Sequence, residues 1–490
     1  MTPASYPKVL FATSEAHPLI KTGGLADVSG ALPVALHALG LDIKLLIPGY
    51  RAIWDQCKNH TTHLAKFANP YAPGDVYLFE SRLPGTDLPV IIVAYDAFFN
   101  RDGGPYQAPS GADWPDNPQR FALLSYAAAW LGSHLNTATW RPDIVHCNDW
   151  QTGLAPAYLR FWQGKNAASV MTVHNLAYQG VFDASLVSTL QLPPESFKLQ
   201  GLEYHGNLSF LKAGLFYSHR ITTVSPTYAR EIQHETLGFG MQGLLHERRA
   251  VLHGIVNGID IQSWDPEHDP YLSKNYSAQS LDDKLQNKTA LQREMGLHVE
   301  AHTPLVAIVS RITYQKGSEV VLGLMYDLVR EGVQFVLLGS GDKNLERAYS
   351  ELGRNHPGRI SINIGYDEGL SHRIEAGADI FLMPSHFEPC GLNQMYSQRY
   401  GTTPVAHATG GLADTIVDAT TVNLDAGKAS GILFYDMHYP TVIAALRHAV
   451  HLFRAEPKTW RKLQSAGMAQ DFSWQKSAQE YLQLYLSLKP

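Results

Sequence analysis

The residues best able to do chemistry include two cations that stand five positions apart, Arg311 and Lys316, in the segment Ser310–Gly317. The segment follows a strand-like stretch and precedes a helix-like one. Guanidinium and ammonium groups in such a place can clamp a diphosphate, because both donate charge-assisted hydrogen bonds to its oxygens. The alternative is a pair of solvated surface charges.

The hexapeptide Thr-Gly-Gly-Leu-Ala-Asp occurs twice, at 22–27 and at 409–414. Each copy follows a strand-like stretch and opens a helix-like one. A glycine pair in that position lets the backbone approach a ligand and turn its N–H groups toward an anion. The alternative is two unrelated tight turns, with Lys21 a surface lysine. The candidate residues are Lys21, Gly23, Gly24, Thr409, Gly410 and Gly411.

A carboxylate, Glu388, lies in the segment Phe387–Leu392, just after another strand. The helix that begins near Gly391 can hold a phosphate on its first N–H groups while Glu388 meets a sugar. The alternative is a carboxylate that only caps the helix.

Two further strand ends carry polar residues. His174 follows Val173, and Asp149 stands in the polar run His146–Trp150. His174 is either a ligand contact or a satisfied structural histidine. Asp149 either accepts from a sugar hydroxyl or caps the next helix.

Strand-like and helix-like stretches alternate along most of the chain, which predicts α/β structure with doubly wound parallel sheets. Ligands bind such sheets beyond the carboxyl ends of the strands, where these polar residues stand. The repeated hexapeptide indicates two similar halves facing a cleft. We expect an N-terminal domain over 1–252, a second domain over 253–463, and a C-terminal helix over 464–490 that crosses back to the first.

Composition excludes several classes of protein. The 490 residues carry a net charge of −6 without long charged runs, so nucleic acid is not expected as the main partner. No apolar run is long enough to cross a membrane, and Met1–Lys8 has no signal-peptide character. The three cysteines form neither a disulfide framework nor a metal-ligand pattern. We therefore expect a cytoplasmic enzyme without a metal or other cofactor.

Longer motifs, taken together, show a family resemblance. The chain closely resembles bacterial glycogen synthases and plant starch synthases, which are retaining glycosyltransferases built from two Rossmann-like domains, the glycosyltransferase B fold. The motifs span nearly the whole chain in the family's order. They are Lys21–Val28, Thr172–Gly180, Leu211–Leu215, Thr222–Ile232, Asn257–Asp260, Ser310–Gly317, Phe387–Leu392, Thr409–Thr415 and Asp471–Trp474.

The resemblance implies an ADP-glucose donor, an α-1,4-glucan acceptor and transfer with retention of configuration. Arg311 and Lys316 would then bind the leaving diphosphate, and Glu388 would face the glucose. The other implied donor contacts are His174, Asn257, Lys21, Gly23, Gly24, Cys390, Gly391, Leu392, Thr409, Gly410 and Gly411, with Tyr366 stacked on adenine. Tyr106 and Asp149 would lie near the acceptor.

Tyr396 stands where many retaining transferases have a second glutamate, a departure that bacterial glycogen synthases share. Asn148 and His386 stand where relatives often have His and Arg. No carboxylate is evident as a nucleophile on the opposite face of the sugar. The family resemblance implies front-face transfer assisted by the diphosphate. The alternatives are a UDP-glucose-dependent transferase, a glycogen phosphorylase, and a catalytically silent glucan-binding scaffold.

Overall fold

The computed structural model describes residues 6–488 and divides into two units. The first unit runs to Gly258 and includes the chain from Trp474 onward, and the second is Ile259–Ser473. The unit boundary follows 258 rather than the expected 252, because β12 (Leu252–Gly254) pairs in parallel with β11 (Arg220–Thr223) in the first sheet.

The first unit is built on a nine-stranded sheet with the order β12-β11-β7-β6-β1-β2-β5-β4-β3. All neighbours are parallel except β4 with β5 and β3 with β4, which are antiparallel. The remaining strands are β1 (Val9–Ala12), β2 (Ile43–Pro48), β3 (Thr62–Ala68), β4 (Asp75–Arg82), β5 (Pro89–Ala94), β6 (Ile144–Asn148) and β7 (Ala168–Val173). A small antiparallel sheet contains β8 (Val181–Phe182), β9 (Glu203–Tyr204) and β10 (Asn207–Ser209).

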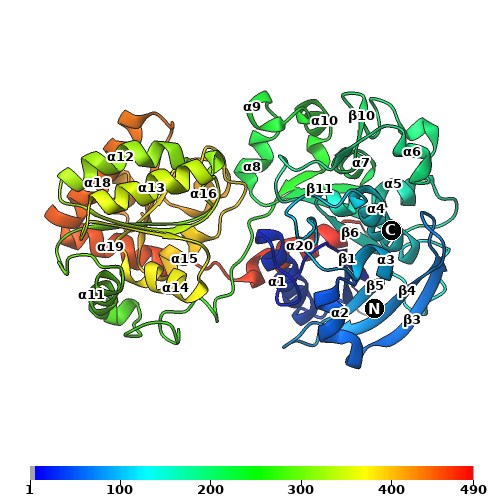
Figure 1. The fold of residues 1–490 in the computed structure, drawn as a ribbon, viewed down its shortest axis with the longest axis horizontal. Helices are drawn as coiled ribbons and strands as arrows, with labels where there is room; N and C mark the ends of the chain where they lie inside the picture. Colours follow the sequence, from blue (N-terminus) through cyan, green and yellow to red (C-terminus); the bar gives the residue numbers. More distant parts are fainter. Residues whose placement is uncertain (1–5, 489–490) are drawn as a thin grey trace. The chain divides into compact units, whose positions relative to one another are not determined.

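Helices cover both faces of the large sheet. On one face α1 (Gly24–Ala38) lies beside α20 (Trp474–Leu486), so the two ends of the chain pack together (Figure 1). On the other face α4 (Asn117–Leu131), α5 (Ala155–Phe161) and α7 (Phe210–Tyr217) pack in series. The shorter helices are α2 (Arg51–Cys57), α3 (Asp96–Phe99), α6 (Leu186–Thr189), α8 (Pro226–Glu231), α9 (Glu235–Gly238) and α10 (Gln242–Glu247).

The second unit has a six-stranded, wholly parallel sheet with the order β15-β14-β13-β16-β17-β18. Its strands read as almost continuous apolar runs, as strands buried on both faces do. They are β13 (Leu305–Val309), β14 (Gln334–Gly339), β15 (Ile360–Ile364), β16 (Ile380–Met383), β17 (Thr403–His407) and β18 (Ile432–Phe434).

The helices of the second unit form a layer on each side of this sheet (Figure 1). One layer contains α12 (Ser318–Arg330), α13 (Lys343–Asn355) and α18 (Tyr439–Ala455). The other contains α11 (Lys284–Glu294), α14 (Glu368–Gly377), α15 (Asn393–Arg399) and α19 (Pro457–Met468). The short helices α16 (Gly410–Thr415) and α17 (Thr421–Asp425) complete the unit.

The single C-terminal helix expected over 464–490 is instead two helices. α19 ends at Met468 and belongs to the second unit, whereas α20 begins at Trp474 and belongs to the first. Ile259 donates its N–H to the carbonyl of Phe472, so the two segments that pass from one unit to the other lie side by side. No helix in the described part of the chain is long and apolar enough to cross a membrane.

A buried polar network fixes α20 to the first sheet. The imidazole of His146 on β6 contacts the Tyr485 hydroxyl through Nδ1 at 2.6 Å and the Thr172 hydroxyl through Nε2 at 2.6 Å. Burial lowers the pKa of His146 to about 3. The ring is therefore neutral in the folded protein, where a proton would leave a charge without water.

We predict that this histidine makes the protein less stable in mild acid. Its pKa in the folded protein lies below 6.5, the ordinary pKa of histidine. Between about pH 3 and 6.5 the unfolded chain therefore binds more protons than the folded protein does. The unfolding free energy should then fall as pH drops through this window, by about 1.4 kcal/mol per pH unit for one proton. Urea unfolding at pH 7 and pH 5 gives the free energy of unfolding of the wild type and of His146→Gln. We expect the slope of this free energy against pH to be smaller in His146→Gln, by about 1.4 kcal/mol per pH unit. The exposed His448→Gln is the control, and an unchanged slope in His146→Gln would refute the assignment.

Candidate functional site

Several of the predicted site residues lie where the winding of each sheet reverses, whereas Tyr366 and the second hexapeptide follow β15 and β17. In the first unit the parallel strands run outward from β1 through β2 on one side and from β6 through β7 on the other. In the second unit the corresponding pair is β13 and β16. Loops after two such strands diverge to opposite faces of the sheet, which leaves a crevice that open α/β sheets use for ligands.

The clearest cluster in the second unit joins the loops that follow β13 and β16. The Lys316 ammonium contacts the Glu388 carboxylate at 2.5 Å. The Ser385 hydroxyl donates to the same Oε2 at 2.9 Å. Glu388 is only 6% exposed, so this cation neutralises a carboxylate that has largely lost its water.

Further contacts hold these two loops together. His386 donates its N–H to the Gln315 carbonyl, and the Gln315 amide donates to the Phe387 carbonyl. The Tyr314 ring stacks on the His386 ring with centroids 4.2 Å apart. His386 Nε2 also contacts Glu319 at 2.6 Å. The spacing of Lys316 from Glu388 is therefore set by several independent contacts.

Arg311 and Tyr366 lie on the surface of the same unit. Arg311 is exposed in the turn that follows β13, and Tyr366 is 76% exposed after β15. The Tyr366 hydroxyl donates to the Glu368 carboxylate.

The second copy of the hexapeptide lies beneath the Glu388 loop. A Cβ built on Gly410 would lie 1.9 Å from the Glu388 carbonyl oxygen, and one on Gly411 would lie 2.1 Å from that of Cys390. Gly411 donates its N–H to the carbonyls of Glu388 and Pro389. This N–H is thus used within the protein, and the glycines serve a close backbone-to-backbone contact.

A buried glutamine fixes the same loop from below. The Gln394 amide donates to the carbonyls of Cys390 and Gly391 and to the Thr415 hydroxyl. Gln394 is fully buried, and the sequence analysis did not single it out. The candidate phosphate contacts at Gly391 and Leu392 are consequently held in one conformation.

The first copy of the hexapeptide is open. A Cβ on Gly23 or on Gly24 would meet nothing within 4 Å. The N–H groups of Thr22 and Gly23 donate to Oε2 of Glu15 at 2.5 and 3.3 Å. Lys21 contacts Asp27 at 2.8 Å. The two copies of the hexapeptide thus have the same sequence but different neighbours in the fold.

We predict that alanine lowers the stability of the protein much more in the second copy than in the first. Gly411→Ala should destabilise the ligand-free protein by about 1–3 kcal/mol, since its Cβ overlaps the Cys390 backbone. The matched Gly24→Ala should change the unfolding free energy by less than about 0.5 kcal/mol, since its Cβ lies in open space. Thermal and urea unfolding of the two variants make the comparison. Equal losses would show that the packing of the two glycine pairs does not differ as described.

In the first unit, Asn148 at the end of β6 and Asp149 just after it hold His174, which follows β7. Oδ1 of Asp149 accepts the His174 N–H at 2.8 Å, and Oδ1 of Asn148 contacts the ring at Nε2, 3.0 Å away. Burial lowers the pKa of His174 to about 3 and raises that of Asp149 to about 7. His174 is therefore a neutral ring at neutral pH.

Asp149 has an unusual backbone. Its φ is +54° with ψ −176°, a region in which a side chain is strained. The carboxylate accepts hydrogen bonds from the backbone N–H groups of His174 and Asn175. This carboxylate consequently has protein partners in addition to any ligand.

Tyr106 joins the cluster through Glu15. The Tyr106 hydroxyl donates to Oε1 of Glu15 and also contacts the Ser14 hydroxyl at 2.9 Å. Glu15 is 3% exposed and bridges Tyr106 to the Thr22–Gly23 backbone. Glu15 was not among the predicted site residues. A charged residue shortly after a fully buried strand could have indicated it.

Asn257 is 7% exposed and lies at the end of the first unit. Its Oδ1 has no hydrogen-bond partner among the described residues, although the atom is buried. A buried acceptor without a partner costs free energy, so Oδ1 of Asn257 is a candidate contact for a ligand or an ordered water.

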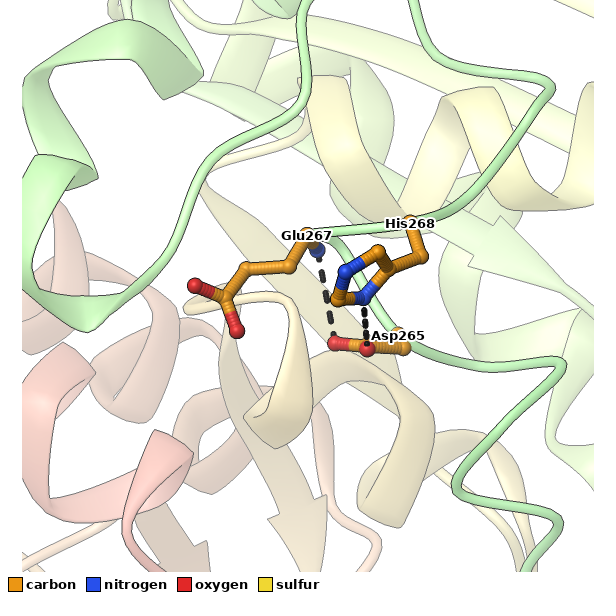
Figure 2. Close-up of side chains that lie close together, drawn as sticks. All are labelled: Asp265, Glu267 and His268. Atoms are coloured by element: carbon orange, nitrogen blue, oxygen red, sulfur yellow. Dashed lines mark hydrogen bonds and ion pairs between the residues drawn. The ribbon is translucent and has the colours of Figure 1, made fainter.

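Among the described residues, one group of side chains has metal-ligand spacing: Asp265, Glu267 and His268, whose ligand atoms lie within 4.8 Å of one another (Figure 2). The sequence analysis did not single out this group. The Asp265 carboxylate already contacts His268 Nδ1 at 2.8 Å and Arg399 at 3.6 Å. A guanidinium this close disfavours a second cation, so the group does not indicate a metal site.

Comparison with known proteins follows the same division of the chain. The family model of the starch synthase catalytic domain matches residues 8–247, and that of glycosyl transferases group 1 matches residues 297–431. The catalytic domain of starch synthase IV from Arabidopsis thaliana, solved with ADP and acarbose, has a TM-score of 0.87 at 30% identity, with 99% of each chain covered. Sucrose-phosphate synthase from Thermosynechococcus elongatus shares the fold, with a TM-score of 0.59 at 18% identity.

Two Rossmann-like units with these edge residues define a glycosyltransferase of the B fold. The glycogen synthase of Nitrosospira multiformis is 52% identical over 100% of this chain and 99% of its own. That of Nitrosomonas europaea is 52% identical over 98% and 97%. The chain belongs to the glycogen synthase family of bacterial glucan-forming enzymes, which confirms the resemblance.

Proposed function

We propose that this enzyme transfers glucose from ADP-glucose to the non-reducing 4-hydroxyl end of an α-1,4-glucan, with retention of configuration. The Lys316–Glu388 pair at the β13–β16 crevice carries the proposal. It places a cation for a departing diphosphate 2.5 Å from a carboxylate for a sugar that develops positive charge. The relative solved with ADP and acarbose, a nucleotide and an oligosaccharide analogue, supports the same pair of ligands.

In this proposal the leaving group is stabilised by cations of the chain. Arg311 and Lys316 bind the diphosphate, with Lys21 and the backbone at Gly23, Gly24, Gly391 and Leu392. Before the donor binds, Glu388 holds Lys316, so the diphosphate replaces or shares a contact that already exists. The ammonium is thus oriented in advance, which reduces reorganisation during the reaction.

The remaining predicted contacts complete the donor and acceptor sites. His174 and Asn257 line the glucose pocket, Tyr366 stacks on adenine, and Tyr106 and Asp149 lie near the acceptor. Cys390, Thr409, Gly410 and Gly411 are the other proposed donor contacts. The Gly411 N–H already donates to the carbonyls of Glu388 and Pro389, which supports a structural role for this glycine beside the proposed donor contact.

The test is release of ADP from ADP-glucose in the presence of glycogen and EDTA, with UDP-glucose assayed in parallel. We expect ADP release and chain extension without added metal, because Arg311 and Lys316 replace the charge that a metal would supply. UDP release alone would contradict the donor assignment. Loss of activity in EDTA that magnesium or manganese restores would contradict the metal-free mechanism.

The diphosphate clamp makes a quantitative prediction. Arg311→Ala and Lys316→Ala should each lower kcat by about a hundredfold or more, since each removes a charge-assisted contact to the leaving group. Arg347→Ala and Lys458→Ala, exposed cations of the same unit, are the controls and should retain activity. Turnover near that of the wild type in both clamp variants would remove the basis of the assignment.

We also propose a cytoplasmic location. Cys57, Cys147 and Cys390 are buried free thiols, as is usual for proteins of a reducing compartment. Nucleic acid and membrane are not expected as partners, since the net charge is −6 and the sequence has no long charged run and no apolar run that could cross a membrane.

A further inference from the structure

Asn148 contacts two groups that together determine its orientation. Its Nδ2 donates to the carbonyl of Ala12, at the end of β1, at 3.1 Å. A carbonyl oxygen can only accept, so the NH2 end of the amide must face β1. The other end, Oδ1, then faces His174 Nε2 at 3.0 Å. Asn148 is 1% exposed, and water cannot easily take either place.

This orientation determines where His174 carries its proton. An amide oxygen has no hydrogen to donate, so the Asn148–His174 contact requires a proton on Nε2. In a neutral imidazole the other nitrogen, Nδ1, then has a lone pair and no hydrogen. The ring is held at its backbone as well, since the His174 N–H donates to Asp149.

We propose that Asn148 is a positioning residue that fixes His174 as the Nε2–H tautomer, so that Nδ1 accepts a hydrogen bond from a sugar hydroxyl. A group with no proton to donate, such as a carboxylate or a phosphate oxygen, has no favourable contact with this nitrogen. The side chain therefore selects a neutral hydroxyl over an anion. The sugar contact rests on the proposed function, whereas the tautomer rests on the Asn148 contacts alone.

The titratable groups around the pair support a neutral ring. Burial lowers the pKa of His174 to about 3. His146, buried on the same strand as Asn148, is also neutral because burial lowers its pKa to about 3. Asp149 is the nearest carboxyl, and burial, followed by the charge of Glu15, raises its pKa to about 7 against the opposing backbone N–H groups. No cation is among these groups.

The direct test reads the two ring nitrogens of the wild-type enzyme by long-range ¹H–¹⁵N NMR at pH 7. The His174 signals are assigned by their loss in His174→Ala. We expect a protonated Nε2 and an unprotonated Nδ1. A proton on Nδ1, or on both nitrogens, would overturn the inference whether or not the enzyme is active.

Addition of ADP with glucose tests the sugar contact separately. We expect the Nδ1 resonance to move toward its hydrogen-bonded position while Nε2 stays protonated. An unchanged Nδ1 signal at saturating ligand would refute the sugar contact and leave the tautomer standing. Absence of any glucosyl transfer from ADP-glucose would instead count against the proposed function.

Two substitutions test the role of Asn148 in the enzyme. Asn148→Asp puts a carboxylate beside Nε2, which favours a doubly protonated ring. We expect kcat to fall tenfold or more at pH 7, and the ratio of variant to wild-type kcat to rise with pH as the ring loses its second proton. Asn148→Ala removes the tether without adding charge, so its ratio should not depend on pH. Parallel pH profiles for both variants would overturn the positioning role, and unfolding curves verify that each variant folds.

Discussion

The geometry of both units depends on one constraint, the right-handed crossover between parallel strands. Because nearly all such connections turn the same way, a sheet that winds outward in both directions from a central strand must send neighbouring loops to opposite faces. The first unit does this between β1 and β6, and the second between β13 and β16. Glu15 and Asp149 follow the first pair and Asn148 ends β6, whereas Arg311, Lys316 and Glu388 follow the second. The chemistry is concentrated at these points because the backbone leaves room there.

Charge within these crevices is balanced locally before any ligand arrives. Glu388 is paired with Lys316, and Glu15 accepts two backbone N–H groups and a phenol hydroxyl. An unpaired carboxylate at this depth would cost several kcal/mol, so each one has a partner. A donor that binds here therefore meets charged groups that already have partners in the protein. It must replace or share the existing contacts of Lys316 and Glu388.

Much of this arrangement could be predicted from the sequence. The strands, the polar residues that follow them and the family motifs are all patterns of residues close together in the chain. Glu15 could not, because its role depends on Tyr106, which is distant in sequence. The hexapeptide shows the same limit: Gly24 and Gly411 have identical neighbours in sequence, yet Gly411 packs against Cys390 and Gly24 faces open space. The helix expected over 464–490 was interrupted for a tertiary reason, since the chain leaves one unit near Ser473 and joins the other. The antiparallel pairing of β3 and β4 departs from the parallel sheets that the sequence predicts.

The division of the chain also bears on synthesis at the ribosome. The second unit is a continuous stretch, Ile259–Ser473, inserted within the first, which needs α20 from the extreme C-terminus. The inserted unit can therefore fold completely while translation continues, since all its strands are already made. The first unit is made earlier but finishes later, because His146 and its neighbours on β6 stay uncovered until Tyr481 and Tyr485 emerge. The first unit, although it begins the chain, can complete its fold only after the C-terminal helix α20 has been made.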